Sequence, residues 1–255
     1  MIKVNDILEL LKAFAPTEDA ESWDNVGLIV GDGEAKVKKI LVTLDITPAS
    51  VREAIDAGAD LIVSHHPVIF KPVYNVRSSN CTGDVVRSLI KNDISAICMH
   101  TNLDVAEGGV NDELAKTLRL RHIGVIPQSA GLLRYGYLEA PMRVQDFVKF
   151  VSDTLGTPAV KYTDIDHDVN LVAVGGGACG DFMSSAVEFG CDAFVSSDLK
   201  YNTLLDADYL GICAVDAGHF NTERPVCNVL ERIISDKFSD ILIVQSNTVP
   251  NIKGI

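Results

Sequence analysis

The sequence predicts an α/β protein made of two similar α/β domains with mostly parallel sheets. Short apolar runs alternate with segments of helical periodicity, which is typical of a parallel sheet covered by helices. Three apolar runs end in side chains that bind metals, and residues 40–64 resemble residues 171–196, either by duplication or by chance similarity of two ordinary β-α-β units. Because ligands bind at the carboxyl ends of parallel strands, we expect a metal site in the cleft between the domains.

The first half of the chain alternates helix and strand. Apolar residues recur at helical spacing over 2–14, and Thr47 with Pro48 has the composition of a helix cap and a first helical residue. The segment 67–82 is long and irregular, and such loops are usually functional or mobile. The expected helices cover 2–14, 47–58, 84–90 and 111–118, and the expected strands cover 28–30, 39–44, 60–64 and 95–99.

A change of composition divides the chain near its middle. The stretch 124–143 is rich in glycine and proline, so we place a boundary there between a domain 1–125 and a domain 126–255. In the second domain we expect helices over 144–155, 182–189 and 223–238 with a short one before 211, and strands over 169–174, 193–195, 211–215 and 241–244. The first domain would carry His65, His66 and Asp104, and the second would carry His219 and Glu223.

The composition argues against several classes of function. A formal net charge of −13 disfavours binding to the phosphate backbone of nucleic acid, which requires Lys and Arg. None of the six cysteines forms a C-x-x-C pair, which indicates a reducing compartment without disulfides. Charges interrupt the first residues, so they do not resemble a signal peptide, and no apolar run reaches the length of a membrane span. We expect a cytoplasmic protein with no membrane partner.

The first candidate ligands are His65 and His66, which follow the apolar run 60–64. Neighbouring residues on a regular strand point to opposite faces, so both rings reach one centre only if the strand has ended or two metals flank the pair. Pro67 favours the first case, because it restricts His66 to extended geometry and cannot continue the ladder. The structural alternative is a pair that only hydrogen-bonds loop backbone. In the register of the internal repeat, His65 and His66 correspond to Ser197 and Asp198.

Two further segments supply the other candidates. Asp104 is a hard oxygen ligand that suits zinc, iron or manganese beside imidazoles, although it could instead form an Asx turn. His100 could bind metal, but we expect it to orient other ligands. His219 and Glu223 share one helix face after Gly218, an arrangement also common in solvated pairs. The strand expected over 95–99 is followed by His100, Asn102 and Asp104. The strand expected over 211–215 is followed by Asp216, His219 and Glu223.

A glycine-rich motif at residues 175–180 matches G-x-G-x-x-G between a strand and a helix. Taken alone it predicts a nucleotide-cofactor oxidoreductase. It lies late in the chain, however, and Asp198 only loosely supplies the acidic residue expected about twenty positions later. A phosphate cradle and a tight turn that requires glycine are the other two interpretations. We assign no nucleotide cofactor to it.

Together these motifs resemble the GTP cyclohydrolase 1 type 2 family, also called Nif-three-like proteins. The matching motifs follow the family order over nearly the whole chain, at 22–28, 44–47, 64–67, 100–104 with 108–112, 175–180 and 216–223. The resemblance implies two α/β domains in the short form of the family and a ring-shaped homohexamer with metal sites facing an interior cavity. It also implies a dinuclear site built from His65, His66, Asp104, His219 and Glu223.

One position departs from the family. Related chains often have a histidine after the segment 197–201, where this chain has Asn202. If that histidine assists proton transfer, this protein lacks the step or uses another group.

The ligand set indicates metal-assisted hydrolysis. Two divalent ions (zinc, iron or manganese) bridged by Glu223 would lower the pKa of a water and polarise the substrate. The resemblance implies a GTP-like nucleotide attacked at the imidazole carbon of the purine ring, and Lys71 and Lys200 are candidates for binding its phosphates. We assign Glu223 as the carboxylate that bridges the two ions and His100 as a residue that orients the ligands. We assign no other catalytic group. A non-catalytic ring protein that stores or senses metal, or docks partners, would carry the same ligands but show no turnover.

Overall fold

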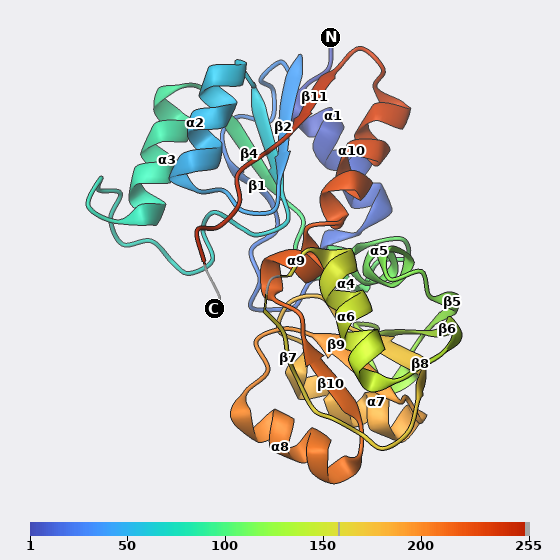
Figure 1. Cartoon of the computed structure of the whole chain (residues 1–255). Coiled ribbons are helices and arrows are strands. Elements are labelled where there is room, and N and C mark those ends of the chain that lie inside the picture. The colour runs from blue at the N-terminus through green and yellow to red at the C-terminus, as the bar shows by residue number, and fades with distance from the viewer. Residues whose placement is uncertain (158, 253–255) are drawn as a thin grey trace. The chain divides into compact units, whose positions relative to one another are not determined.

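The computed structural model describes residues 1–157 and 159–252, which form two compact units (Figure 1). The first unit is Met1–Ala106 with Val226–Pro250, and the second begins at Glu107 and runs through Pro225. Each unit has one sheet with helices packed on it. The expected α/β fold with two similar domains is therefore confirmed.

The two units do not divide the chain in the stretch 124–143. Strand β11 (Leu242–Gln245) pairs with β2 (Lys39–Thr43), and helix α10 (Val226–Lys237) packs on α1 (Val4–Phe14), so the end of the chain belongs to the first unit. The metal-ligand candidates are distributed as expected, with Asp104 in the first unit and Glu223 in the second. The domain boundary at residue 125 stays a prediction.

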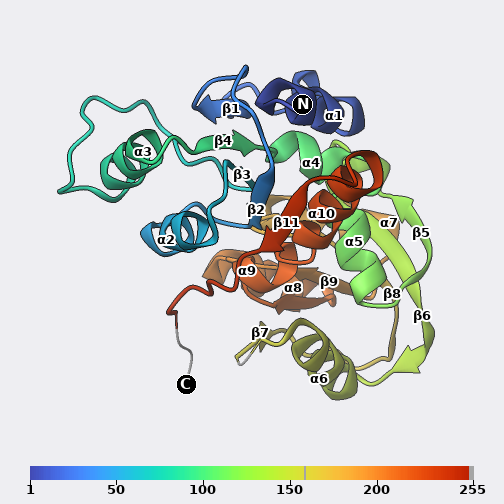
Figure 2. The same cartoon turned by 90° about the horizontal axis from the view of Figure 1, so that it is seen from above.

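The first unit contains a five-stranded sheet in the order β1-β4-β3-β2-β11. All neighbours pair in parallel except β1 (Gly27–Val30), which is antiparallel to β4 (Ser95–Cys98), and β3 (Leu61–Ser64) lies in the centre. Helices α2 (Pro48–Ala57) and α3 (Cys81–Lys91) cover one face, and α1 and α10 cover the other (Figures 1 and 2). The carboxyl ends of β2, β3 and β4 therefore lie side by side.

The second unit contains a six-stranded sheet in the order β5-β6-β8-β9-β10-β7. Its centre is parallel, and the remaining strands pair antiparallel, so "mostly parallel" describes the first sheet and only the centre of the second. The strands are β5 (Arg121–Val125), β6 (Arg134–Met142), β7 (Lys161–Tyr162), β8 (Val169–Val174), β9 (Ala193–Ser196) and β10 (Cys213–Asp216).

Helices cover both faces of the second sheet. Side chains of α5 (Val110–Thr117) and α6 (Val144–Leu155) share a core with alternate residues of β8, β9 and β10. Side chains of α7 (Met183–Phe189) and α8 (Tyr201–Leu210) share a core with the intervening residues, as the period of two in a strand requires. The short helices are α4 (Thr101–Val105), α9 (His219–Glu223), and the 3₁₀ turns η1 (Thr17–Asp19), η2 (Pro127–Ser129) and η3 (Gly180–Phe182).

The sequence-based expectation lacked strands β5, β6 and β7 and helix α4, and two differences have a clear physical reason. The stretch 124–143 contains β6, because its glycines allow close packing: a Cβ on Gly124 would lie 2.7 Å from the ring of Tyr135, and one on Gly136 2.7 Å from the Cβ of Leu120. The helix expected over 223–238 begins only at Val226, because Pro225 separates α9 from α10.

The internal repeat is visible in equivalent backbone interactions. Gly58 ends α2 and Gly190 ends α7, and both adopt the left-handed conformation. Asp60 Oδ2 then accepts hydrogen bonds of 2.7 and 3.0 Å from the backbone at the start of β2. Asp192 Oδ2 accepts bonds of 2.9 and 2.8 Å from the start of β8. These shared interactions support the expected register between the two halves.

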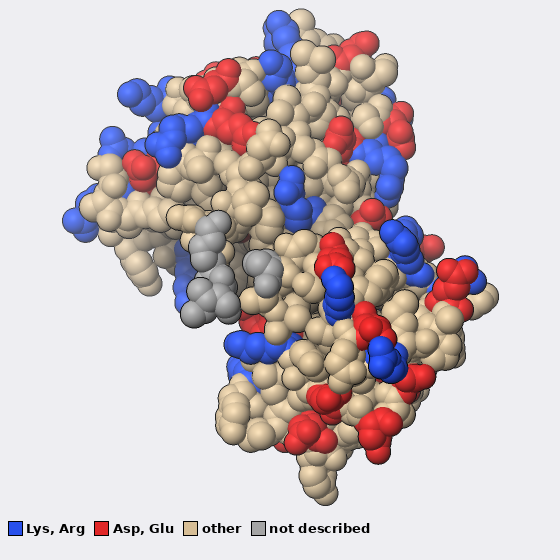
Figure 3. Space-filling model, viewed as in Figure 1, with Lys and Arg blue, Asp and Glu red and all other residues tan. Residues whose placement is uncertain are grey.

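The distribution of charge and the length of the helices are relevant to binding of nucleic acid and of membranes. On the face drawn in Figure 3, the Lys and Arg side chains of the described residues are scattered among Asp and Glu rather than gathered into one basic surface. Within 1–157 and 159–252, no helix combines the length and the apolar character that crossing a membrane requires.

Candidate metal centre

The backbone turns where β3 ends, and this brings two histidine rings together. The strand stops at Ser64, and the next two amides both bond to the end of β2: His65 N–H to Thr43 O at 3.4 Å and His66 N–H to Leu44 O at 2.9 Å. Successive amides of a regular strand would point to opposite sides. The two rings consequently lie 4.9 Å apart at an interplanar angle of 45°. This is the geometry that Pro67 predicts.

Both histidines are oriented by an oxygen acceptor at Nδ1. His65 Nδ1 lies 2.9 Å from Met99 O, and His66 Nδ1 lies 2.8 Å from Asp45 Oδ1. Since carbonyl and carboxylate oxygens only accept hydrogen bonds, each Nδ1 is the donor, and in a neutral ring Nε2 then has the lone pair. This tautomer is the one that metal-binding histidines use. The bond of His65 to a backbone carbonyl is also what a strand-capping pair would make, whereas His66 bonds a carboxylate.

His100 follows β4 and is held in the same way. Its Nδ1 lies 2.9 Å from Asp24 Oδ1, and the buried Asp24 carboxylate also accepts from the Thr101 amide at 3.0 Å and the Thr101 hydroxyl at 2.6 Å. Burial by itself raises the pKa of the Asp24 carboxyl, but the hydrogen bonds from His100 and Thr101 outweigh burial and hold the pKa well below its ordinary value. Ligand nitrogens of His65, His66 and His100 lie within 4.8 Å of one another.

Asp104 lies on α4, with its Oδ1 3.5 Å from His65 Nε2. Two ligands bound tetrahedrally to zinc at about 2.1 Å lie about 3.4 Å apart, so this spacing suits two ligands of one ion. The turn before Asp104 is held by Asn102, whose Oδ1 accepts from His100 N–H at 3.0 Å. Asn102 is buried and its amide also donates to Ala15 O at 2.8 Å, so it fixes the backbone rather than a ligand.

The second unit places His219 and Glu223 on α9, after β10. His219 Nδ1 lies 2.8 Å from Asp198 Oδ2, and His219 Nε2 lies 3.1 Å from Glu223 Oε2. The Glu223 side chain is only 5% exposed, so this is not the solvated pair that the four-residue spacing also allows. Asp216 does not join them, because its carboxylate accepts from the Leu199 amide at 3.2 Å.

The glycine-rich segment 175–180 makes room for Glu223. Its amides are already bonded within the protein: Gly176 N–H to Asn111 Oδ1 at 2.7 Å and Gly177 N–H to Thr222 Oγ1 at 3.0 Å. Gly177 has φ +65°, and a Cβ there would overlap Glu223 Oε1. These contacts favour the interpretation as a tight turn that requires glycine over a cradle for phosphate.

Sequence reasoning found the histidines but missed the carboxylates that orient them. Asp24, Asp45 and Asp198 each bind the Nδ1 of one candidate histidine. The sequence did contain a signal for these carboxylates, since Asp45 and Asp198 follow apolar strands and Asp24 lies in the matched motif 22–28. Asn202, the position that departs from the family, is exposed in the first turn of α8.

The structure thus gathers two sets of candidate ligands, one in each unit. The first set joins His65 and His66 with His100 and Asp104, and the second joins His219 with Glu223. That the two sets meet at one centre stays a prediction.

These sets lie at the carboxyl ends of strands in a duplicated α/β protein. The chain belongs to the Duf34/NIF3 (NGG1p interacting factor 3) family, whose model matches residues 2–252. It is 35% identical over 246 residues to a protein named GTP cyclohydrolase 1 type 2 homolog from Clostridium perfringens, covering 92% of this chain and 94% of the relative. A Streptomyces coelicolor protein of the same name is 33% identical, with coverage of 98% and 93%.

Solved structures show the same fold. Staphylococcus aureus protein SA1388 superposes with a TM-score of 0.92 at 29% identity, covering 100% of this chain and 99% of that one. Reduced HcgD from Methanocaldococcus jannaschii gives a TM-score of 0.82 at 26% identity, with coverage of 97% and 98%. The family resemblance carried by the sequence motifs is confirmed.

Proposed function

We propose that the protein is a dinuclear-metal-dependent hydrolase that acts on a nucleotide-like small molecule. One observation carries the proposal: His65, His66, His100 and His219 each have an oxygen acceptor on Nδ1, which leaves Nε2 as the ring atom that each can offer to a metal. The curated relatives named GTP cyclohydrolase 1 type 2 homolog support the substrate class.

The residues present suit two divalent ions. His65 and Asp104 would hold one ion, His66 and His219 the other, and Glu223 would be the carboxylate shared by both. The mixed nitrogen and oxygen set fits zinc, iron or manganese. When bound, such a pair of ions lowers the pKa of a water and polarises the substrate.

Other side chains would tune and assist this centre. The carboxylates of Asp45 and Asp198 would fix the tautomer and the ring orientation of the histidines they contact, as carboxylates behind metal-binding histidines do. His100 lies outside the proposed ligand set but is fixed by Asp24 beside His65 and His66, so it is placed to move a proton.

Lys71 is the better of the two candidate lysines for a substrate phosphate. Lys200 Nζ lies 3.7 Å from Asp181 Oδ1, so part of its charge is already balanced. Lys71 is exposed in the loop that follows His66 and lines a cavity there.

Turnover by the metal-loaded protein tests the proposal. Zinc, iron or manganese protein should hydrolyse at least one member of a panel of nucleotides and phosphoesters. Glu223→Gln should abolish this activity, whereas the exposed Glu188 of the same unit offers a matched control, Glu188→Gln, that should keep it. Full metal occupancy without turnover across the panel would overturn the hydrolase and favour a non-catalytic metal-binding ring.

We also propose that the protein forms a homohexamer and that it is located in the cytoplasm. Light scattering should give the mass of six chains of 27.5 kDa each. A monomeric mass at micromolar concentration would contradict the hexamer and leave the hydrolase to be judged by turnover.

A further inference from the structure

Two exposed aromatic rings lie beside His100 in the first unit. The side chains of Trp23 and Phe70 are 56% and 50% exposed, and their ring centroids lie 5.6 Å apart at 64°. Each ring also lies 6.1 Å from the His100 ring, at 75° and 78°. We call Trp23, Phe70 and His100 the aromatic corner. Large aromatic rings exposed together in this way mark interaction sites.

The corner is fixed by hydrogen bonds on both sides. Asn25 Nδ2 donates to Ile69 O at 2.7 Å, which joins the loop of Trp23 to the loop of Phe70. Asp24, next to Trp23, is anchored to His100 as described above. The two loops that carry the rings are therefore joined without a ligand, and a preorganised site loses less entropy when it binds.

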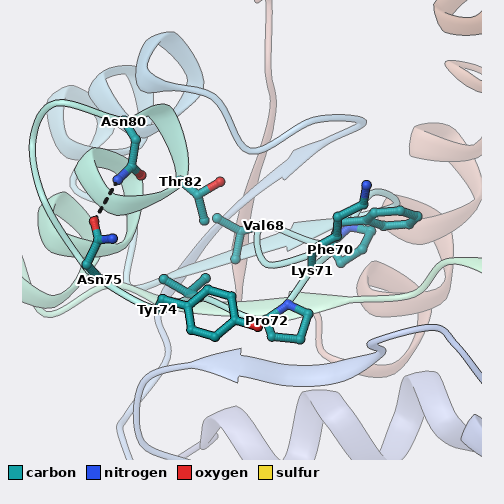
Figure 4. Close-up of a pocket in the computed structure, with 10 residues that line it drawn as sticks. Val68, Phe70, Lys71, Pro72, Tyr74, Asn75, Asn80 and Thr82 are labelled. Carbon is teal, nitrogen blue, oxygen red and sulfur yellow. Dashed lines mark hydrogen bonds between the residues drawn. The ribbon is translucent and has the colours of Figure 1, made fainter.

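A cavity of about 460 Å³ begins at Phe70, within the size range of small-molecule sites. Figure 4 shows Phe70 and Lys71 at one end and Asn75 with Asn80, joined by a hydrogen bond of 3.3 Å, at the other. Of the described residues that line the cavity, Lys71 alone is charged. The site thus offers aromatic surface, one cation and amide groups within one unit.

We infer that the aromatic corner stacks a planar, purine-type ring of the substrate, with Lys71 placed to meet its phosphate. An edge-to-face pair leaves ring surface exposed on both Trp23 and Phe70, and base-on-aromatic stacking binds any nucleobase by such surface. His100 is part of the corner, so a stacked ring would lie next to the candidate ligands of the first unit. The identification of this ligand as the substrate rests on the proposed function.

Trp23 makes the inference directly measurable, because it is the only tryptophan in the chain. In metal-free protein, GMP should quench Trp23 fluorescence to saturation, whereas ribose 5-phosphate should not. Phe70→Leu should raise the dissociation constant for GMP about tenfold, and Phe70→Tyr should restore it, because tyrosine returns the ring. Tyr201 offers a matched control, since Tyr201→Leu removes an exposed ring from α8 of the second unit and should leave the GMP titration unchanged.

Several results would overturn the inference. Equal quenching by ribose 5-phosphate, or a Phe70→Leu variant that keeps its circular dichroism and binds GMP normally, would exclude stacking. If dilution of the protein lowered the mass of its assembly and changed Trp23 fluorescence in parallel, a second copy of the chain would be what covers the rings. GMP binding at the corner without turnover by any metal form would contradict only the hydrolase. Nucleotide turnover without an effect on Trp23 fluorescence would contradict only the corner.

Discussion

Replacing Gly177 with alanine should displace the Glu223 carboxylate while costing the fold little. The added Cβ would overlap Glu223 Oε1 and lie 3.1 Å from the carboxyl carbon and 3.2 Å from His219 Nε2. Carbon atoms in contact normally lie about 3.5–4.0 Å apart, so the carboxylate has to move by roughly 0.5 Å or more. The clash is with the end of a flexible side chain, so the side chain can relieve it by moving.

The expected magnitudes for metal binding and for stability differ. A shift of that size exceeds the tolerance of about 0.2 Å on metal–ligand distances, so metal affinity should fall by at least about tenfold. The left-handed backbone at Gly177, with φ +65°, should cost about 1 kcal/mol of unfolding free energy once it carries a Cβ. Gly211 provides a matched control in the same unit, because it has φ +72° and nothing within 4 Å of its ideal Cβ.

The assay compares Gly177→Ala with Gly211→Ala. Urea unfolding of the metal-free proteins should show similar losses of stability, and competition with a chromophoric chelator should show weaker zinc binding for Gly177→Ala alone. Wild-type zinc affinity in Gly177→Ala would refute the reasoning, because it would mean that the position of Glu223 does not matter to the metal.

Further predictions concern acid stability, thiols and nucleotide cofactors. The folded pKa of Asp24 is depressed, so its ionised form stabilises the fold above its unfolded pKa of about 3.9, and this stabilisation disappears as pH falls through the folded pKa. Asp24→Asn should thus cost about 2–3 kcal/mol in urea unfolding at pH 7, with the difference shrinking below about pH 4, and a constant difference would contradict this. Burial raises the pKa of Cys191 and Cys213 to about 12 and that of Cys98 well above its usual value, and Cys81 is exposed, so one thiol per folded chain should react with Ellman's reagent. Reaction of a second thiol before unfolding would argue against the buried positions. NAD should not raise the melting temperature, since the amides of Gly176 and Gly177 are already bonded, and a clear stabilisation by NAD would revive the dinucleotide interpretation.

Periodic patterns in the sequence predicted the regular elements well. Helix α6 over 144–155 and strand β8 over 169–174 have the expected bounds, because apolar spacing and local breakers determine them. Strands β5 and β6 were missed because Gly124 and Gly136 resemble breakers, whereas in the structure they give room to a neighbouring side chain. A close approach of that kind depends on tertiary packing, which a local pattern does not contain.

The same distinction applies to the candidate ligands. His65 and His66 stand out because a strand ends in two metal-binding side chains. The Asp45 that orients His66 is 21 residues away in the chain and meets it only because β2 and β3 are neighbours in the sheet. Supporting contacts of this kind follow from strand order, so they required the structure.

The central claim is that ligands from both units share one pair of ions. A crystal structure of zinc-loaded protein with anomalous scattering tests it most directly. Two peaks should appear, with His65 and Asp104 at one, His66 and His219 at the other, and Glu223 bound to both at about 2.0–2.2 Å. Peaks bound only by ligands of a single unit, or His65 and Glu223 too distant to share a cation, would contradict the account.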